Sequence, residues 1–103
     1  MLQLGGEGSL RTFLRAAIED VDEAMAHLHE DLANNNVDAA LDRLHALKNV
    51  FLSVGDTAAV LASGDLANAL RSGRNAPALL ARLVDGAATV RTRLVREAAS
   101  PTT

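Results

Sequence analysis

The stretch that decides the fold runs from Val37 to Asp56, with the sequence VDAALDRLHALKNVFLSVGD. On a wheel that turns about 100° per residue, its apolar residues fall on one arc centred near Leu44 and Phe51. The residues of that arc are Val37, Ala40, Leu41, Leu44, Leu47, Phe51 and Val54. His45 lies roughly 120° from the centre of the arc. The pattern therefore predicts an amphipathic helix that buries one side and holds an imidazole on the other.

The residues from His45 onward carry a family signature. His45-Ala46-Leu47-Lys48 is followed by Ser53-Val54-Gly55. This pattern resembles the histidine-containing phosphotransfer (HPt) domain of bacterial phosphorelays. It has the histidine, leucine and lysine of that family and, further along, its small polar residue, aliphatic residue and glycine. The opening Leu4-Gly5-Gly6 and the long acidic segment after it are also similar to the family. The resemblance covers nearly the whole chain, and its specific part is the helix around His45.

One position departs from the family pattern. Asn49 stands where the family usually has glycine, four residues after the histidine, and Val50 and Phe51 replace small residues. Residues four apart lie on one side of a helix, so Asn49 is a neighbour of His45. Its amide would either form a hydrogen bond with the imidazole or hinder an incoming phosphoryl group.

The resemblance implies a specific role for each residue of this helix. His45 would be the phosphoacceptor, through attack by Nε2 on the aspartyl phosphate of a docked response-regulator receiver domain. The receiver would supply Mg²⁺, and this domain would hold no cofactor or metal of its own. Lys48 would either contact phosphoryl oxygens or cover apolar surface with its stem. The remaining residues expected to contact the receiver or the phosphoryl group are Asn49, Leu41, Asp42 and Leu52, with Asp38 on the same flank.

Three functions are compatible with these residues. The first is a phosphorelay intermediate, a phosphocarrier and not an enzyme, which passes a phosphoryl group between receivers. Such a domain would be cytoplasmic. It would be either the C-terminal module of a membrane-anchored hybrid sensor histidine kinase or a protein in its own right. The second is a module on the same fold that docks a receiver or another enzyme and regulates it without phosphotransfer, an option favoured by Asn49 and Phe51. The third, a structural dimerisation domain, would need a broad exposed apolar face.

Composition narrows the class of protein. The 103 residues suffice for one domain, with residues 1–8 and 99–103 expected to be flexible ends. Alanine and leucine dominate, and the only aromatic residues are Phe13 and Phe51, which favours helices. Cysteine is absent, and no apolar run is long enough for a membrane span. The formal net charge of −3 and the scarcity of aromatic rings argue against nucleic acid as a partner.

The rest of the chain predicts three further helices. Ser9 is expected to cap a helix that ends near Ala33, and Asn34-Asn35-Asn36 to stop it and start the next. Gly55 would end the His45 helix, Asp56 or Thr57 would cap a third over about 57–71, and Asn75 a fourth over about 76–98. The expected buried stripes outside the His45 helix are Leu10, Phe13, Leu14, Ala17, Ile18, Val21, Met25, Leu28 and Leu32; Ala59, Ala62, Leu66 and Leu70; and Leu79, Leu80, Leu83, Val84, Ala87, Val90 and Leu94. Short connections between them predict an all-α, antiparallel up-down-up-down four-helix bundle.

The other ionisable residues do not suggest an enzyme. His27 and His29 are two apart, so on a helix they point roughly 200° away from each other and cannot chelate one metal. The carboxylates show no arrangement that singles out a general acid and base. No glycine-rich phosphate loop, Ser-His-Asp set or zinc spacing is found. An independent active site is therefore not expected.

Overall fold

Four helices make up the part of the chain that the structure describes. The structure is a computed structural model covering residues 6–74 and 76–99, the first four by backbone alone. The helices are α1 (Gly6–Ala33), α2 (Val37–Ser53), α3 (Thr57–Arg71) and α4 (Pro77–Ala99). The third has the bounds that the sequence predicts, and Pro77 begins the fourth, where its missing N–H is tolerated.

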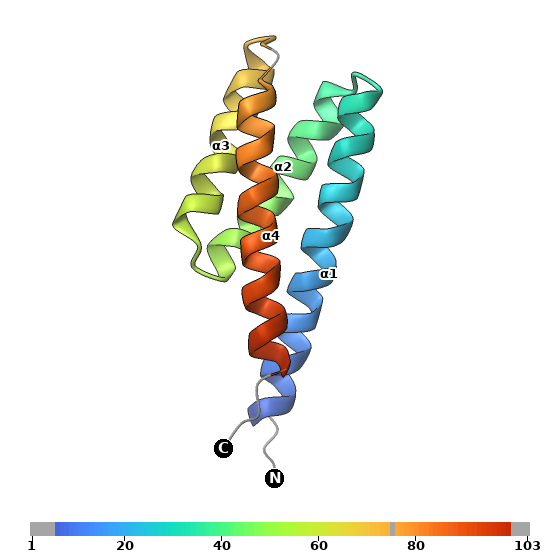
Figure 1. Cartoon of the computed structure of the whole chain (residues 1–103). Coiled ribbons are helices and arrows are strands. Elements are labelled where there is room, and N and C mark those ends of the chain that lie inside the picture. Colours follow the sequence, from blue (N-terminus) through green and yellow to red (C-terminus); the bar gives the residue numbers. More distant parts are fainter. Residues whose placement is uncertain (1–5, 75, 100–103) are drawn as a thin grey trace.

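The helices form a closed ring. α1 packs against α2 and α4, and α3 packs against the same two helices. Figure 1 shows each helix running back along the one before it, so that α1 begins and α4 ends at the same end of the bundle. The predicted all-α four-helix bundle is confirmed. Within residues 6–74 and 76–99, no helix has both the length and the apolar character needed to cross a bilayer.

The three turns share one hydrogen-bonding pattern. After α2, the N–H of Gly55 donates to the carbonyl of Leu52 at 3.1 Å, and that of Asp56 donates to Phe51 at 3.0 Å. This Schellman pattern requires a left-handed residue, and Gly55 has a φ of +75°. Asn35 and Gly73 have the same role after α1 and α3, with φ of +56° and +70°. The predicted stops at the asparagine run and at Gly55 are confirmed.

Side-chain caps begin the helices that follow two of these turns. Oδ1 of Asn36 accepts a hydrogen bond from the backbone N–H of Ala39 at 3.3 Å. Oδ1 of Asp56 accepts one from the N–H of Ala59 at 2.9 Å, so Asp56 and not Thr57 caps α3. Each cap satisfies a donor that the first turn of a helix leaves free and contributes about 1 kcal/mol.

The fully buried large apolar side chains of the core come from α1, α2 and α4, and α3 contributes mostly small ones. Fully buried large residues are Val21, Leu28, Leu44, Leu47, Phe51, Leu83, Val90 and Leu94. α3 contributes Leu66 and the small residues Ala59, Ala62, Ser63, Ala67 and Ala69. A Cβ at Gly86 of α4 would lie 3.7 Å from Cα of Ala59, so α3 and α4 approach closely at this point. The buried Oγ of Ser63 donates to the carbonyl of Ala59 and is satisfied.

The predicted buried stripe is wrong at its N-terminal end. Leu10 and Phe13 are 54% and 47% exposed, although Leu10 lies in line with the buried Leu14. Figure 1 shows the reason: the start of α1 and the end of α4 extend past the turn between α2 and α3, so two of the four helices are missing there. Val37 and Val84, at the edges of their stripes, are also exposed.

The predicted ends of the bundle need a second correction. α1 begins at Gly6, so Ser9 is inside the helix and does not cap it. Likewise α4 continues to Ala99, one residue beyond its predicted end near residue 98. Asn75, proposed as the cap of α4, lies outside the described residues, as do residues 1–5 and 100–103.

Exposed ion pairs connect the helices. Arg91 Nε of α4 donates to Oδ1 of Asp22 in α1 at 2.8 Å, and this bond and the charge attraction raise the pKa of Arg91 above its ordinary value. Arg82 of α4 pairs with Asp65 of α3. In addition to these ion pairs, Nη2 of Arg93 donates a hydrogen bond to the backbone carbonyl of Val54, at the end of α2, at 3.0 Å. Exposed pairs of this kind each contribute at most about 1 kcal/mol.

Two glycines with open space around them should respond oppositely to alanine. At both Gly55 and Gly64 an added Cβ would meet no atom within 4 Å. Gly64 lies inside α3, so Gly64→Ala should raise the free energy of unfolding by about 0.5–1 kcal/mol. Gly55 has a left-handed backbone, so Gly55→Ala should lower it by about 1 kcal/mol. Urea denaturation measures both, and equal signs for the two variants would contradict this account.

Candidate functional site

Burial of one side of α2 determines where its other side points. Ala40, Leu44, Leu47 and Phe51 are at most 1% exposed, so the helix cannot rotate without exposing them. His45 directly follows Leu44 in the sequence and is exposed to solvent, as predicted. The fold therefore holds the imidazole on a rigid helix with its ring open to the surroundings.

His45 belongs to a stripe on the outside of α2. Leu41, His45, Lys48 and Leu52 follow at intervals of four, three and four residues, which places them along one side of the helix. Leu41 is half-buried, Lys48 is exposed, and Leu52 is 56% exposed. We call these four residues the His45 stripe. The imidazole of His45 and the ammonium group of Lys48 thus lie between two leucine side chains.

The polar side chains around His45 are available. Within residues 10–74 and 76–99, no hydrogen bond or ion pair involves the side chain of His45, Lys48 or Asp42. Asp42 and Lys48 lie one turn before and one turn after the imidazole, with opposite charges. A ligand that approaches His45 would therefore meet a lone cation and a lone carboxylate on either side of the ring.

Asn49 lies beside the His45 stripe, on the flank of α2 that faces α1. Together with Ala46 and Val50 it lines a groove between α2 and α1, whose α1 wall includes Asp20, Glu23 and His27. His45 does not line this groove. The side chain of Asn49 makes no hydrogen bond to His45, while its backbone carbonyl accepts one from Oγ of Ser53 at 3.0 Å. The structure therefore does not show the hydrogen bond considered for Asn49. Crowding of the imidazole is the role that remains.

The two remaining histidines do not add to the site. His27 is half-buried in the groove between α1 and α2, and His29 is exposed elsewhere on α1. Among the residues that the structure describes, no group of three or more histidine, aspartate and glutamate side chains is arranged to hold a metal ion.

A small recess extends the site toward α3. Leu52 lines it together with Phe51, Gly55 and Asp56 of α2 and its turn, and with Thr57 and Val60 of α3. Its volume is about 100 Å³, room for a single side chain. Sequence analysis missed the contribution of Val60, because nothing in the α3 sequence indicates which of its residues faces the end of α2.

Comparisons with known proteins identify no relative. No protein-family model, curated protein or solved structure matches the chain. The HPt resemblance therefore stays a prediction that depends on the residues of α2 themselves.

The exposure of His45 leads to a stability prediction. His45→Gln removes no buried contact and no hydrogen bond, so the free energy of unfolding should change by less than about 0.5 kcal/mol. The matched control is Leu44→Ala at the preceding, fully buried position, which should cost about 2–5 kcal/mol. Thermal or urea unfolding measures both, and a large loss for His45→Gln would mean that the ring supports the fold.

Proposed function

We propose that this bundle is a phosphotransfer module that carries a phosphoryl group on His45 between receiver aspartates. The observation that carries the proposal is the exposed imidazole of His45, which has no hydrogen-bond or ion-pair partner among the described residues. It lies on a helix whose orientation is fixed by its buried side chains. A nucleophilic imidazole needs a free nitrogen lone pair and an unobstructed line of approach.

The reaction needs little from this chain besides position. The lone pair of Nε2 attacks the phosphorus of an aspartyl phosphate, the N–P bond forms, and the P–O bond to the aspartate breaks to release its carboxylate. The ring proton stays on Nδ1 during the transfer. The docked receiver would supply Mg²⁺ for the developing charge, and Lys48, one turn from His45 on the same stripe, is the cation that α2 offers to the phosphoryl oxygens.

The His45 stripe also suits a docked protein. Its ends, Leu41 and Leu52, offer aliphatic contact on both sides of the imidazole, and Val60 continues that surface onto α3. Apolar contacts surrounded by polar groups are typical of the centre of a protein interface. The receiver domain of a response regulator is the partner that would bring an aspartyl phosphate to this stripe.

A second candidate function has the same docking surface but no transfer. Leu52, 56% exposed, favours partner binding whether or not His45 is phosphorylated. Asn49, one turn from the imidazole, would then obstruct the phosphoryl group. Such a module would regulate a receiver or another enzyme by occupancy.

Phosphoryl transfer from a panel of phosphorylated receivers separates the two candidates. We expect an acid-labile, base-stable label on the wild-type domain and none on His45→Gln. Receiver binding is measured in parallel by titration calorimetry. Binding without label would establish the docking module, and neither label nor binding would exclude both candidates.

The role of Asn49 can be tested by removing its side chain. Asn49→Gly should raise the rate of phosphoryl transfer to His45, by up to about tenfold if relief of crowding lowers the barrier by about 1.4 kcal/mol. Asn49→Ala is the matched control, because it removes the amide while keeping a strong helix former. An unchanged or lower rate in both variants would show that Asn49 is neutral or helpful.

A further inference from the structure

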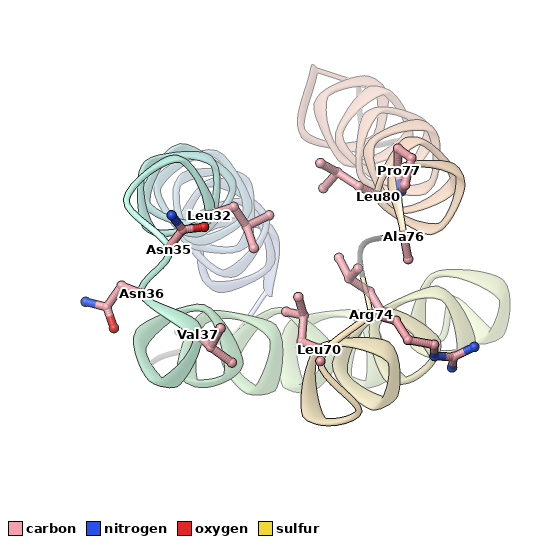
Figure 2. Close-up of a pocket in the computed structure, with 11 residues that line it drawn as sticks. Leu32, Asn35, Asn36, Val37, Leu70, Arg74, Ala76, Pro77 and Leu80 are labelled. Carbon is pink, nitrogen blue, oxygen red and sulfur yellow. The ribbon is translucent and has the colours of Figure 1, made fainter.

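A recess opens at the end of the bundle where α1 turns into α2 and α3 turns into α4. It has a volume of about 480 Å³ and receives lining residues from all four helices. We call it the end recess. Figure 2 looks along the bundle and shows Leu32, Leu70 and Leu80 directed toward its middle from α1, α3 and α4. His45 does not line it and lies roughly 12 Å, a little over two helical turns, along α2 from Val37.

The depth of the end recess follows from the layers of the core. Leu66, only 2% exposed, is one of its lining residues. The fully buried Leu28 and Leu83 lie one helical turn further into the bundle than Leu32 and Leu80. In the last layer Leu32, Leu70 and Leu80 are only partly buried, and Val37 is 40% exposed. These aliphatic side chains leave space between them.

The chemistry of the lining selects the kind of ligand. The inner wall is made of aliphatic side chains and contains no aromatic ring. The polar residues Asn35, Asn36 and Arg74 are at the rim, and Figure 2 shows the side chains of Asn36 and Arg74 directed away from the middle. Oδ1 of Asn36 accepts the capping hydrogen bond from the N–H of Ala39. Water in an apolar recess has few hydrogen-bond partners, so replacing it with hydrocarbon is favourable.

We propose that the end recess binds the aliphatic chain of a small neutral amphiphile, with its polar head in water at the open mouth. Its volume lies within the roughly 300–1,000 Å³ of small-molecule sites. Ligand sites between the helices of a bundle are a recurring arrangement. This site is independent of His45 and of phosphotransfer.

Methyl NMR with 1-octanol as the probe tests the proposal on the whole chain. We expect saturable shifts and intermolecular NOEs at the methyl groups of Leu32, Leu70 and Leu80. Leu52, exposed on the other part of α2, serves as the internal control and should not respond. Equal shifts at Leu52, or no saturation, would overturn the proposal because they indicate non-specific surface contact.

A series of alcohols of increasing chain length and two alanine-to-leucine variants sharpen the test. From 1-butanol to 1-octanol the affinity should rise about fourfold per methylene, as each one leaves water. Ala76→Leu, at a half-buried lining position, should weaken octanol binding about fifteenfold, equivalent to about two methylenes that no longer fit. Ala78→Leu makes the same addition at an exposed position outside the lining and should leave the affinity unchanged.

The outcomes of this series separate the end recess from other binding sites. Equal binding by both variants would place the alcohol elsewhere and overturn the proposal. Circular dichroism shows whether Ala76→Leu is still folded. If it is not, the NOEs of the wild-type protein decide the question alone.

Discussion

The structure depends on the burial of one side of α2. Four of its side chains, Ala40, Leu44, Leu47 and Phe51, contribute to the core and are almost fully removed from water. At roughly 1.5–3 kcal/mol for a large apolar side chain, their burial far exceeds any exposed ion pair in the bundle. A rotation of α2 that buried His45 would lose this contribution. The position of the candidate site is therefore a consequence of the core and needs no hydrogen bond to maintain it.

The sequence predicted the helices best where two local signals coincide. At Asn34–Asn36 and at Gly55–Asp56, a residue that tolerates left-handed backbone is directly followed by a good cap, and the structure has both features. Gly8 and Ser9 offer the same pair of signals, yet α1 runs through both of them and begins at Gly6. At the two confirmed turns, a helix also ends just before the cap residue, so the pair of signals alone does not locate a helix start.

Tertiary context explains the remaining differences from the sequence prediction. Leu10 continues the buried stripe of α1, but its burial requires α2 and α3 to extend equally far, and hydrophobic periodicity in one helix cannot reveal the lengths of the others. The pair of Arg91 with Asp22 joins residues 69 apart, which no local pattern indicates. In the site, the exposure of His45 and Leu52 followed from the helical wheel. The position of Asn49 in a groove required the packing of α1 against α2.

The even number of helices has a topological consequence for larger proteins. Because α1 begins and α4 ends at one end of the bundle, as Figure 1 shows, polypeptide attached to either helix would depart from the same place. A domain with this geometry can be inserted into a loop of another protein without separating the two halves of its host. The turns at the opposite end, and the outward side of α2, would stay clear of the host. Fusion partners could thus be joined to the bundle without crossing the surface of α2 that carries His45.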